Sequence, residues 1–271
     1  MTNDFTMTKS RLLEGLRRRW REHFDVRLVR WYQLGEAQQA WYLRRLFRSL
    51  RIDLVLDVGG NAGQFARLIR SRVGYRGPLV SFEPVPELAK RLRESARSDS
   101  YWTIVEAALG DSTRCAEFNV MKSSPLSSLL APNHNETQRL HTHNEVARRI
   151  SVDMLTLGDF FERYSQFSSF SNVYLKLDVQ GYEQQIIEGS GASLQRVAAL
   201  QAEMSVISIY EDIPNYKDVM RFIEDQGYVL SFIPAHNYEQ FPDMLDFDCH
   251  FVQRGRLEAL GLLLPAGSNN G

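Results

Sequence analysis

The stretch LVLDVGGNAG, residues 54–63, places a glycine-rich turn directly between an apolar run and a helical pattern over 64–72. In doubly wound α/β folds such a turn connects a buried strand to its helix and faces a ligand at the carboxyl edge of the sheet. Glycine lets the backbone approach that ligand without an intervening Cβ atom. The stretch therefore predicts a ligand-binding turn; the alternative is a tight turn that binds nothing.

The spacing within this turn excludes two phosphate-binding motifs. Asn61 stands where the dinucleotide-binding motif G-x-G-x-x-G has its second glycine, and the Gly-Lys-Ser/Thr ending of a Walker loop is absent. Asp57 precedes the first glycine by two residues. A carboxylate at that strand end suits a cationic or hydroxyl-bearing ligand and repels a diphosphate.

A second acidic residue follows the next expected strand, over 79–82. Glu83 comes directly after this strand, twenty residues beyond Gly63, and Pro84 stops the strand there. An acid in this position can accept hydrogen bonds from both ribose hydroxyls of an adenosine-type ligand. An acid after a strand is weak evidence for ribose binding by itself, but its spacing from the turn at 57–63 supports this interpretation.

The stretch YLKLDVQG, residues 174–181, places polar side chains on an otherwise apolar strand. Because side chains two residues apart share a face of a strand, Lys176, Asp178 and Gln180 are expected on one side. Buried charges are unfavourable unless they are paired. Either Lys176 and Asp178 simply neutralise each other, or Asp178 lies at the carboxyl edge above the reacting group. Glu203, at the end of the following strand, adds a second carboxylate to that edge.

After residue 51 the chain alternates short apolar runs with helical patterns, which indicates a parallel sheet covered by helices on both faces. Strands are expected over 54–58, 79–82, 102–109, 117–121, 173–179, 198–206, 228–233 and 248–253. The run 123–135 is expected to be a loop, and 137–149 a short polar helix. So long an interruption in a compact domain is typical of a functional lid or a disordered segment.

The composition is that of a globular protein, since 44% of the 271 residues are hydrophobic and 24% charged, which excludes wholesale disorder. The two cysteines, Cys115 and Cys249, fit a reducing compartment, and no apolar run is long enough to span a membrane. No secretory signal is visible, so we expect a cytoplasmic protein.

Charge is concentrated at the N-terminus, where residues 1–51 contain twelve Lys and Arg against five Asp and Glu. Aromatic and leucine side chains are interleaved with these arginines at mostly helical spacing. Such a segment could bind nucleic acid or an anionic membrane. Because the aromatic residues are numerous enough to require burial, we favour helices that dock on the acidic body or form a homo-oligomer contact, and nucleic-acid binding is not expected.

An ordered set of short motifs resembles the FkbM family of S-adenosylmethionine-dependent methyltransferases. The matching stretches are, in order, LDVGGNAG (56–63), FEP (82–84), AALGD (107–111), SSL (127–129), DMLTL (153–157), KLDVQGYE (176–183) and QAE (201–203). The resemblance covers roughly residues 52–253. Two residues depart from the family pattern: Gly60 replaces the usual alanine, and Gln180 replaces a frequent glutamate, which casts doubt on any need for a carboxylate at 180.

The resemblance implies a class I, Rossmann-like methyltransferase fold: a seven-stranded, mostly parallel sheet whose last strand is antiparallel. On this basis residues 52–256 are the methyltransferase domain, with a variable lid over 122–150. Residues 1–51 form a basic amphipathic helical extension, and 257–271 a C-terminal tail.

The resemblance also implies roles for individual residues. S-adenosylmethionine is the cofactor, and its methionyl part would be held by Asp57 and by the turn residues Gly59, Asn61 and Gly63. The ribose would be bound at Glu83 and Pro84, and the adenine flanked by Ala108 and Leu109. Asp178 would lie near both the sulfonium and the acceptor.

The implied reaction is in-line methyl transfer to a hydroxyl of a sugar, a glycosylated compound or a polyketide-like small molecule. A base near the acceptor would help, and the candidates are Asp178, Glu203 and a lid histidine, with Lys176 as a further catalytic candidate. No dedicated metal site is expected, although magnesium held by Asp178 and Glu203 stays open. The alternatives are a Rossmann-like NAD-dependent oxidoreductase and a non-catalytic module that binds a cofactor or nucleic acid.

Overall fold

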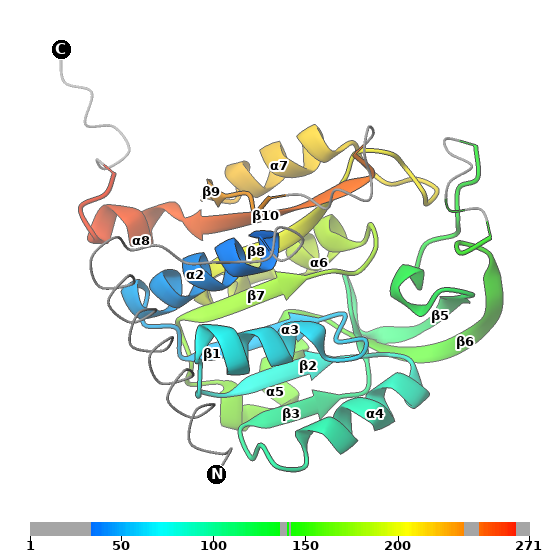
Figure 1. Cartoon of the computed structure of the whole chain (residues 1–271), viewed down its shortest axis with the longest axis horizontal. Coiled ribbons are helices and arrows are strands. Elements are labelled where there is room, and N and C mark those ends of the chain that lie inside the picture. The colour runs from blue at the N-terminus through cyan, green and yellow to red at the C-terminus, as the bar shows by residue number, and fades with distance from the viewer. Residues whose placement is uncertain (1–33, 136–139, 141, 236–243, 264–271) are drawn as a thin grey trace, which may run out of the picture.

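The computed structural model describes residues 34–135, 140, 142–235 and 244–263. Its centre is a seven-stranded sheet (Figure 1). The strands in spatial order are β3 (Trp102–Val105), β2 (Leu79–Phe82), β1 (Leu54–Val58), β7 (Val173–Leu177), β8 (Val197–Ser205), β10 (Asp246–Gln253) and β9 (Tyr228–Phe232). Only β10 runs against its neighbours, and it pairs antiparallel with both β8 and β9. The expected mostly parallel sheet with an antiparallel last strand is therefore confirmed.

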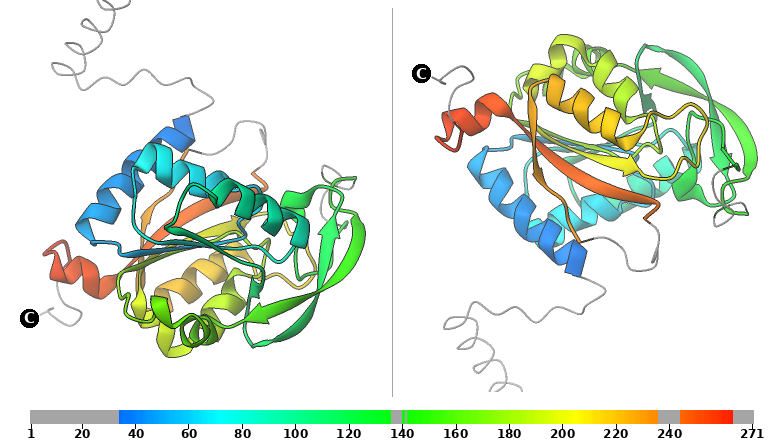
Figure 2. Two further views of the ribbon diagram at one scale, coloured as in Figure 1. Left: turned by 90° about the horizontal axis from the view of Figure 1, so that it is seen from below. Right: turned by 90° about the horizontal axis from the view of Figure 1, so that it is seen from above.

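Helices cover both faces of this sheet (Figure 2). One face carries α2 (Leu34–Ser49), α3 (Gln64–Arg67) with its π-helical continuation Leu68–Val73, and α4 (Pro86–Ala96). The other carries α5 (Leu157–Arg163), α6 (Glu183–Gly189) and α7 (Tyr216–Asp225). The short helix α8 (Arg254–Ala259) follows β10, and 3-10 turns occupy Ser124–Leu126, Ser165–Phe167 and Gly191–Arg196. Every residue of β1, β2 and β7 is buried, which explains why these strands are mainly apolar, with one polar residue each, Asp57, Ser81 and Lys176.

Local signals set where several helices begin. The side chain of Thr156 accepts a hydrogen bond from the amide of Asp159 at the start of α5, and Asn215 accepts one from Lys217 at the start of α7. Each bond satisfies an amide that has no partner inside its helix. Pro86 opens α4, where its missing N–H is no loss.

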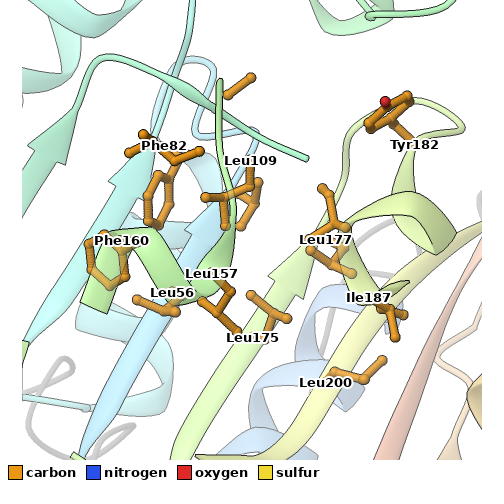
Figure 3. Packing of buried hydrophobic residues seen from close by; sticks show 14 of the residues in the cluster. Leu56, Phe82, Leu109, Leu157, Phe160, Leu175, Leu177, Tyr182, Ile187 and Leu200 are labelled. Carbon is orange, nitrogen blue, oxygen red and sulfur yellow. The ribbon is translucent and has the colours of Figure 1, made fainter. Parts of the chain in front are cut away.

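The larger core lies between the sheet and the helices α5, α6 and α7 (Figure 3). Phe82 from β2 and Phe160 from α5 meet edge to face, with ring centroids 5.0 Å apart. Leu56 and Leu175 come from the neighbouring strands β1 and β7. This core anchors the carboxyl ends of the parallel strands, which carry the candidate site.

The second core joins α2 to the opposite face of the sheet. Leu43 is completely buried, and Phe47 lies with its ring centroid 4.9 Å from that of Tyr174 on β7. Of the basic region expected over 1–51, the structure describes only residues 34–51, and residues 1–33 lie outside the described residues. The apolar side of α2 is thus used within the same chain, against its own sheet.

A small second sheet lies beyond the carboxyl ends of the parallel strands (Figure 1). Its order is β4 (Ala108–Leu109), β6 (Val146–Leu155) and β5 (Arg114–Met121). The single strand expected over 102–109 is therefore wrong: the chain leaves the main sheet after Val105 and pairs again from Ala108 in the second sheet.

The prediction of a polar helix over 137–149 is wrong for those of its residues that the structure describes. Residues 146–149 belong to β6 and pair antiparallel with β5, while residues 136–139 and 141 lie outside the described part of the chain. Pairing with β5 supplies the backbone hydrogen bonds, and side-chain partners such as Glu87 for Arg148 suit an exposed strand. Among the described residues, no helix is both long and apolar enough to cross a membrane.

Replacing Leu43 by alanine tests whether α2 belongs to the folded core. We expect Leu43→Ala to lower the free energy of unfolding by about 2–4 kcal/mol, because the substitution leaves a cavity between α2 and the sheet. Urea unfolding of the full chain, followed by circular dichroism, measures this loss. Arg48→Ala, an exposed position on the same helix, is the control and should change stability by less than about 0.5 kcal/mol. Equal effects of the two substitutions would contradict the packing of α2.

Candidate functional site

A cavity of about 500 Å³ opens at the carboxyl edge of the main sheet. It lies where the strand order reverses, between β1 and β7, which is the usual ligand position in open α/β sheets. Its wall combines the turn after β1, the ends of β2, β7 and β8, the start of β10, the strand β4, the segment Ser124–Ser127 and the first two turns of α2. Most of the residues expected from the sequence line this wall: Gly59, Asn61, Glu83, Pro84, Ala108, Leu109, Lys176, Asp178 and Glu203.

The turn after β1 requires glycine at its first position, residue 59. Gly59 has φ 81°, and a Cβ atom there would collide with the backbone carbonyl oxygen of Asp178. A Cβ on Gly60 would stand 2.9 Å from Leu92 of α4. The amides of both glycines donate to the carbonyl of Phe82, at 3.1 and 2.9 Å. The turn therefore presses against both neighbouring strands and leaves its outer side open to the cavity.

The carboxylate of Glu83 is fixed beside this turn by two backbone amides. Its Oε2 accepts from the amide of Asn61 at 2.7 Å, and its Oε1 accepts from the amide of Val85 at 2.9 Å. Burial raises the pKa of Glu83 to about 7, although both amide bonds act to lower it. Glu83 thus changes its charge close to neutral pH, on the wall of the cavity.

Lys176 occupies the junction of β1 and β7. Its Nζ lies 3.3 Å from Oδ1 of Asp57 and 3.1 Å from Oδ2 of Asp178, and it donates to the carbonyl of Gly59 at 3.2 Å. Burial acts to lower the pKa of Lys176, but the carboxylates of Asp178 and Asp57 raise it by more than burial lowers it. The pKa therefore lies above its usual value, and the amine stays charged. The ion pair between Lys176 and Asp178 that the sequence suggested is therefore present, and Asp57 forms a second ion pair with the same ammonium group.

Asp57 is completely buried and lies beneath the cavity, not on its wall. Its Oδ2 accepts a hydrogen bond from Ser81 at 2.9 Å. Burial raises the pKa of Asp57, and Lys176 opposes this rise. Gly63 also lies off the wall, at the start of α3. The contact of Asp57 with the cavity is therefore indirect, through Lys176.

Gln180 joins the two carboxylates expected at the reacting end. Its Nε2 donates to Oδ1 of Asp178 at 3.2 Å and to Oε2 of Glu203 at 2.6 Å. Strand β7 ends at Leu177, so the shared strand face expected for residues 176, 178 and 180 does not extend to Gln180, which lies in a turn with φ 59°. Burial raises the pKa of Glu203 well above its usual range, and Asp178 and Asp246 raise it further.

Sequence reasoning missed several wall residues that long-range packing supplies. Asp246 and Asp248 extend from β10, and the pairing of β10 with β8 sets Asp248 opposite Glu203. Burial raises the pKa of Asp248 to about 6, while a hydrogen bond with Gln201 opposes the rise. Glu36 and Gln39 come from α2. The one local sequence signal for these residues was the alternation Asp246-x-Asp248, which places two acids on the same face at the start of β10.

Among the described residues of the segment expected as a lid over 122–150, those that line the wall come from its first part. Ser124, Pro125, Leu126, Ser127 and Leu129 line the cavity. Residues 146–150 belong to β6, where they pair with β5. Of the candidate histidine bases, His134 and His143 lie off the wall, and His141 is outside the described residues.

The described residues contain no group of three or more His, Cys, Asp and Glu side chains arranged to hold a metal ion. Asp178 and Glu203, considered for magnesium, are instead bridged by the Gln180 amide. Two carboxylates already bonded to a neutral donor are a poor start for the six oxygen ligands that magnesium prefers.

The amino-acid sequence matches the family model described as Methyltransferase FkbM domain over residues 57–230. The solved structures similar to this chain include methyltransferase FkbM from Methylobacillus flagellatus KT, at 16% identity and a TM-score of 0.47. That alignment covers 74% of this chain and 43% of the other, so the chain spans less than half of that protein. No curated protein matches the chain in sequence.

Two further similar structures contain a cofactor. Aeropyrum pernix fibrillarin, in complex with natively bound S-adenosyl-L-methionine, has 12% identity and a TM-score of 0.43 over 80% of this chain and 76% of that chain. Magnesium protoporphyrin IX methyltransferase from Synechocystis PCC 6803, with bound SAM, has 11% identity and a TM-score of 0.40 over 93% and 98% of the two chains. At such identities the likeness concerns the fold alone.

Removing the buried ammonium tests the electrostatic arrangement beneath the cavity. We expect Lys176→Met to lower the free energy of unfolding by about 3–5 kcal/mol near neutral pH, because it leaves Asp57 buried without its cation. The folded protein must then keep a proton on Asp57 that the unfolded chain releases above about pH 4, so the loss should grow as the pH rises from about 5 to about 8.

Urea unfolding at several pH values measures this loss. Asp57→Asn in the Lys176→Met background is the matched control, and it should recover part of the stability and remove the added pH dependence. A loss that is independent of pH, or a double variant no more stable than Lys176→Met, would show that the two side chains are not coupled in this way.

Proposed function

The chain belongs to the FkbM family of methyltransferases, and from that premise we propose that it transfers a methyl group from S-adenosylmethionine to a hydroxyl of a sugar, a glycosylated compound or a polyketide-like small molecule. The observation that carries this proposal is the position of Glu83. Its carboxylate is fixed beside the glycine turn on the wall of a cavity large enough for a nucleoside-sized ligand.

The residues of the cavity fit this cofactor in chemistry and shape. Gly59 lets the turn pack closely against the backbone of Asp178, and the turn residues Gly59, Gly60 and Asn61 line the cavity. Glu83 offers carboxylate oxygens to the ribose hydroxyls, and Ala108 and Leu109 offer an apolar surface to the adenine. Asp178 supplies negative charge for the cationic methionyl end. Asp57 supports this end from below, through Lys176.

Bound S-adenosylmethionine supplies an electrophilic methyl group, so the protein must mainly align the acceptor oxygen with it. Asp178 is suited to accept the acceptor proton, because its side chain is partly exposed to the cavity and fixed by Lys176 and Gln180. Glu203 is the second base candidate, because burial disfavours its charged form and its Oε2 already accepts a hydrogen bond from Gln180. We therefore assign proton acceptance to Asp178, orientation of the acceptor to Glu203, and positioning of Asp178 to Lys176.

The charge of the wall supports a neutral, hydroxyl-rich acceptor. Among the described wall residues one cation, Lys176, faces six acidic side chains: Glu36, Glu83, Asp178, Glu203, Asp246 and Asp248. Such a wall accepts hydrogen bonds from hydroxyl groups and repels phosphate or carboxylate groups. A polyol fits this wall better than an anionic sugar does.

The proposal extends to the partners and the location of the chain. Contact between copies of the chain through the N-terminal residues would have to use surfaces other than the apolar side of α2, which its own sheet covers. We expect no nucleic-acid partner. A cytoplasmic location is suggested by the cysteines, because Cys115 and Cys249 are both free thiols.

The ribose assignment predicts a binding defect for Glu83→Ala. We expect its affinity for S-adenosylhomocysteine to fall about 10- to 100-fold, because hydrogen bonds to a charged group are lost. Isothermal titration calorimetry measures the affinity, and Glu87→Ala, an exposed acid on α4, is the control. In the wild type the affinity should fall as the pH drops below about 7 and Glu83 takes up a proton. Unchanged affinity in Glu83→Ala would remove the ribose assignment.

The proton-acceptor assignment predicts a catalytic defect for Asp178→Asn. We expect turnover to fall at least about tenfold while S-adenosylhomocysteine still binds, because a positioned base contributes about 10²–10⁴-fold. Transfer of a labelled methyl group to a panel of neutral sugars and glycosides gives the acceptor and then the rate. Asp225→Asn, exposed on α7, is the control. Full turnover in Asp178→Asn would place the base elsewhere.

A further inference from the structure

Gln180 has a backbone conformation that a residue with a side chain seldom adopts. Its φ of 59° lies in the left-handed region, in the turn between β7 and α6, and its side chain is largely buried. Such conformations persist where surrounding contacts determine them, and they are frequent at functional sites. The contacts of Gln180 therefore indicate what its conformation maintains.

The amide group of Gln180 uses its donors and its acceptor on different partners. Both donor contacts go to the carboxylates of Asp178 and Glu203, and Oε1 accepts from the hydroxyl of Tyr210 at 2.8 Å. Turning the amide over would place its oxygen against two carboxylates. The orientation of this side chain is thus determined by its partners.

The same residue is attached to the segment that covers the cavity. The hydroxyl of Tyr210 also lies 2.7 Å from the carbonyl of Leu126, and it has one proton to share between this oxygen and Oε1 of Gln180. Ser128 Oγ donates to the backbone carbonyl of Gln180 at 2.9 Å. Ser128 and Tyr210 are both essentially inaccessible to solvent. Two independent contacts therefore join Gln180 to the wall segment around Leu126.

We infer that Gln180 is a positioning residue that couples the wall segment 124–129 to the carboxylates of Asp178 and Glu203. This inference rests on the proposed function, in which Asp178 accepts the acceptor proton, and on the place of the segment in the cavity wall. One side chain then sets both the orientation of the base and the position of the wall. A neutral amide performs this task because it donates to two acids without adding a third charge.

Replacing the amide by a carboxylate tests the electrostatic half of this inference without cofactor or acceptor. In Gln180→Glu the new acid faces charged and titratable groups from several elements: Lys176 and Asp178 at the end of β7, Glu183 of α6, Glu203 of β8, Tyr210 of the following loop, and Asp246 and Asp248 of β10. Because acids predominate, the pKa of the new group should be raised by its neighbours and by burial.

A group whose pKa is raised by folding destabilises the folded state increasingly as the pH rises above its unfolded pKa. We therefore expect the Tm of Gln180→Glu to fall below that of the wild type by about 5 °C more at pH 8 than at pH 5. Gln184→Glu on α6 is the matched control, since its amide also contacts a carboxylate, that of Glu188, but in a solvent-exposed position. A difference in Tm that does not vary with pH would overturn the electrostatic half.

Hydrogen–deuterium exchange tests the link to the wall segment. Tyr210→Phe keeps the ring and removes the hydroxyl, and we expect amides within 124–130 to exchange about tenfold faster. Gln180→Leu should have the same effect, and Tyr101→Phe, on the exposed surface, should have none. Exchange unchanged in both Tyr210→Phe and Gln180→Leu would overturn the coupling.

The activity measurement separates this inference from the proposed function. With an acceptor in hand, Tyr210→Phe should lower kcat about tenfold while the affinity for S-adenosylhomocysteine stays the same. If the wild type binds no S-adenosylhomocysteine, the proposed function fails, whereas the Tm and exchange results still decide the coupling. Normal kcat together with faster exchange would contradict the positioning role.

Discussion

A single ammonium group, that of Lys176, joins the ends of β1 and β7, the two strands between which the strand order reverses. It contacts Asp57 on β1, Asp178 after β7 and the carbonyl of Gly59 in the intervening turn. Burying the charges of Lys176 and Asp57 side by side is favourable only when their geometry is closely satisfied. The site is thus built outward from this buried pair, and Asp178 is the carboxylate of the junction that meets the cavity.

The polar groups that line the cavity differ between its two ends, near Glu83 and near Glu203. Near Glu83 the polar groups are few and are fixed by backbone amides, with apolar residues from β4 opposite. Near Glu203 the wall is crowded with acids that two glutamine amides, from Gln180 and Gln201, hold in place. Under the proposed function, the first end would hold the cofactor and the second the acceptor. The second end depends on long-range contacts between strands β8 and β10 and the turn after β7.

The parts of the molecule that could be predicted from sequence are those whose signal is local. The apolar runs of β1, β2 and β7 predicted buried strands, and the acids that follow them, Glu83 and Asp178, line the cavity. Asp57 is an instructive case, because its place in the motif was evident but its burial beneath Lys176 was not. Asp248 could not be found, since its pairing opposite Glu203 of β8 brings it to the site. The polar residues of 146–149 form a strand for the same reason: their partner, β5, lies far away in sequence.

The insertion of β10 between β8 and β9 also determines the order in which the sheet can be completed during synthesis. Strand β9 pairs with β10 alone, so it has no place in the sheet until residues 246–253 have left the ribosome. Until then β8 presents an unpaired, largely apolar edge, which is an aggregation hazard for a nascent chain. The last strand to arrive closes this edge and at the same time delivers Asp246 and Asp248 to the cavity. The sheet and the wall of the cavity are therefore completed by the same strand.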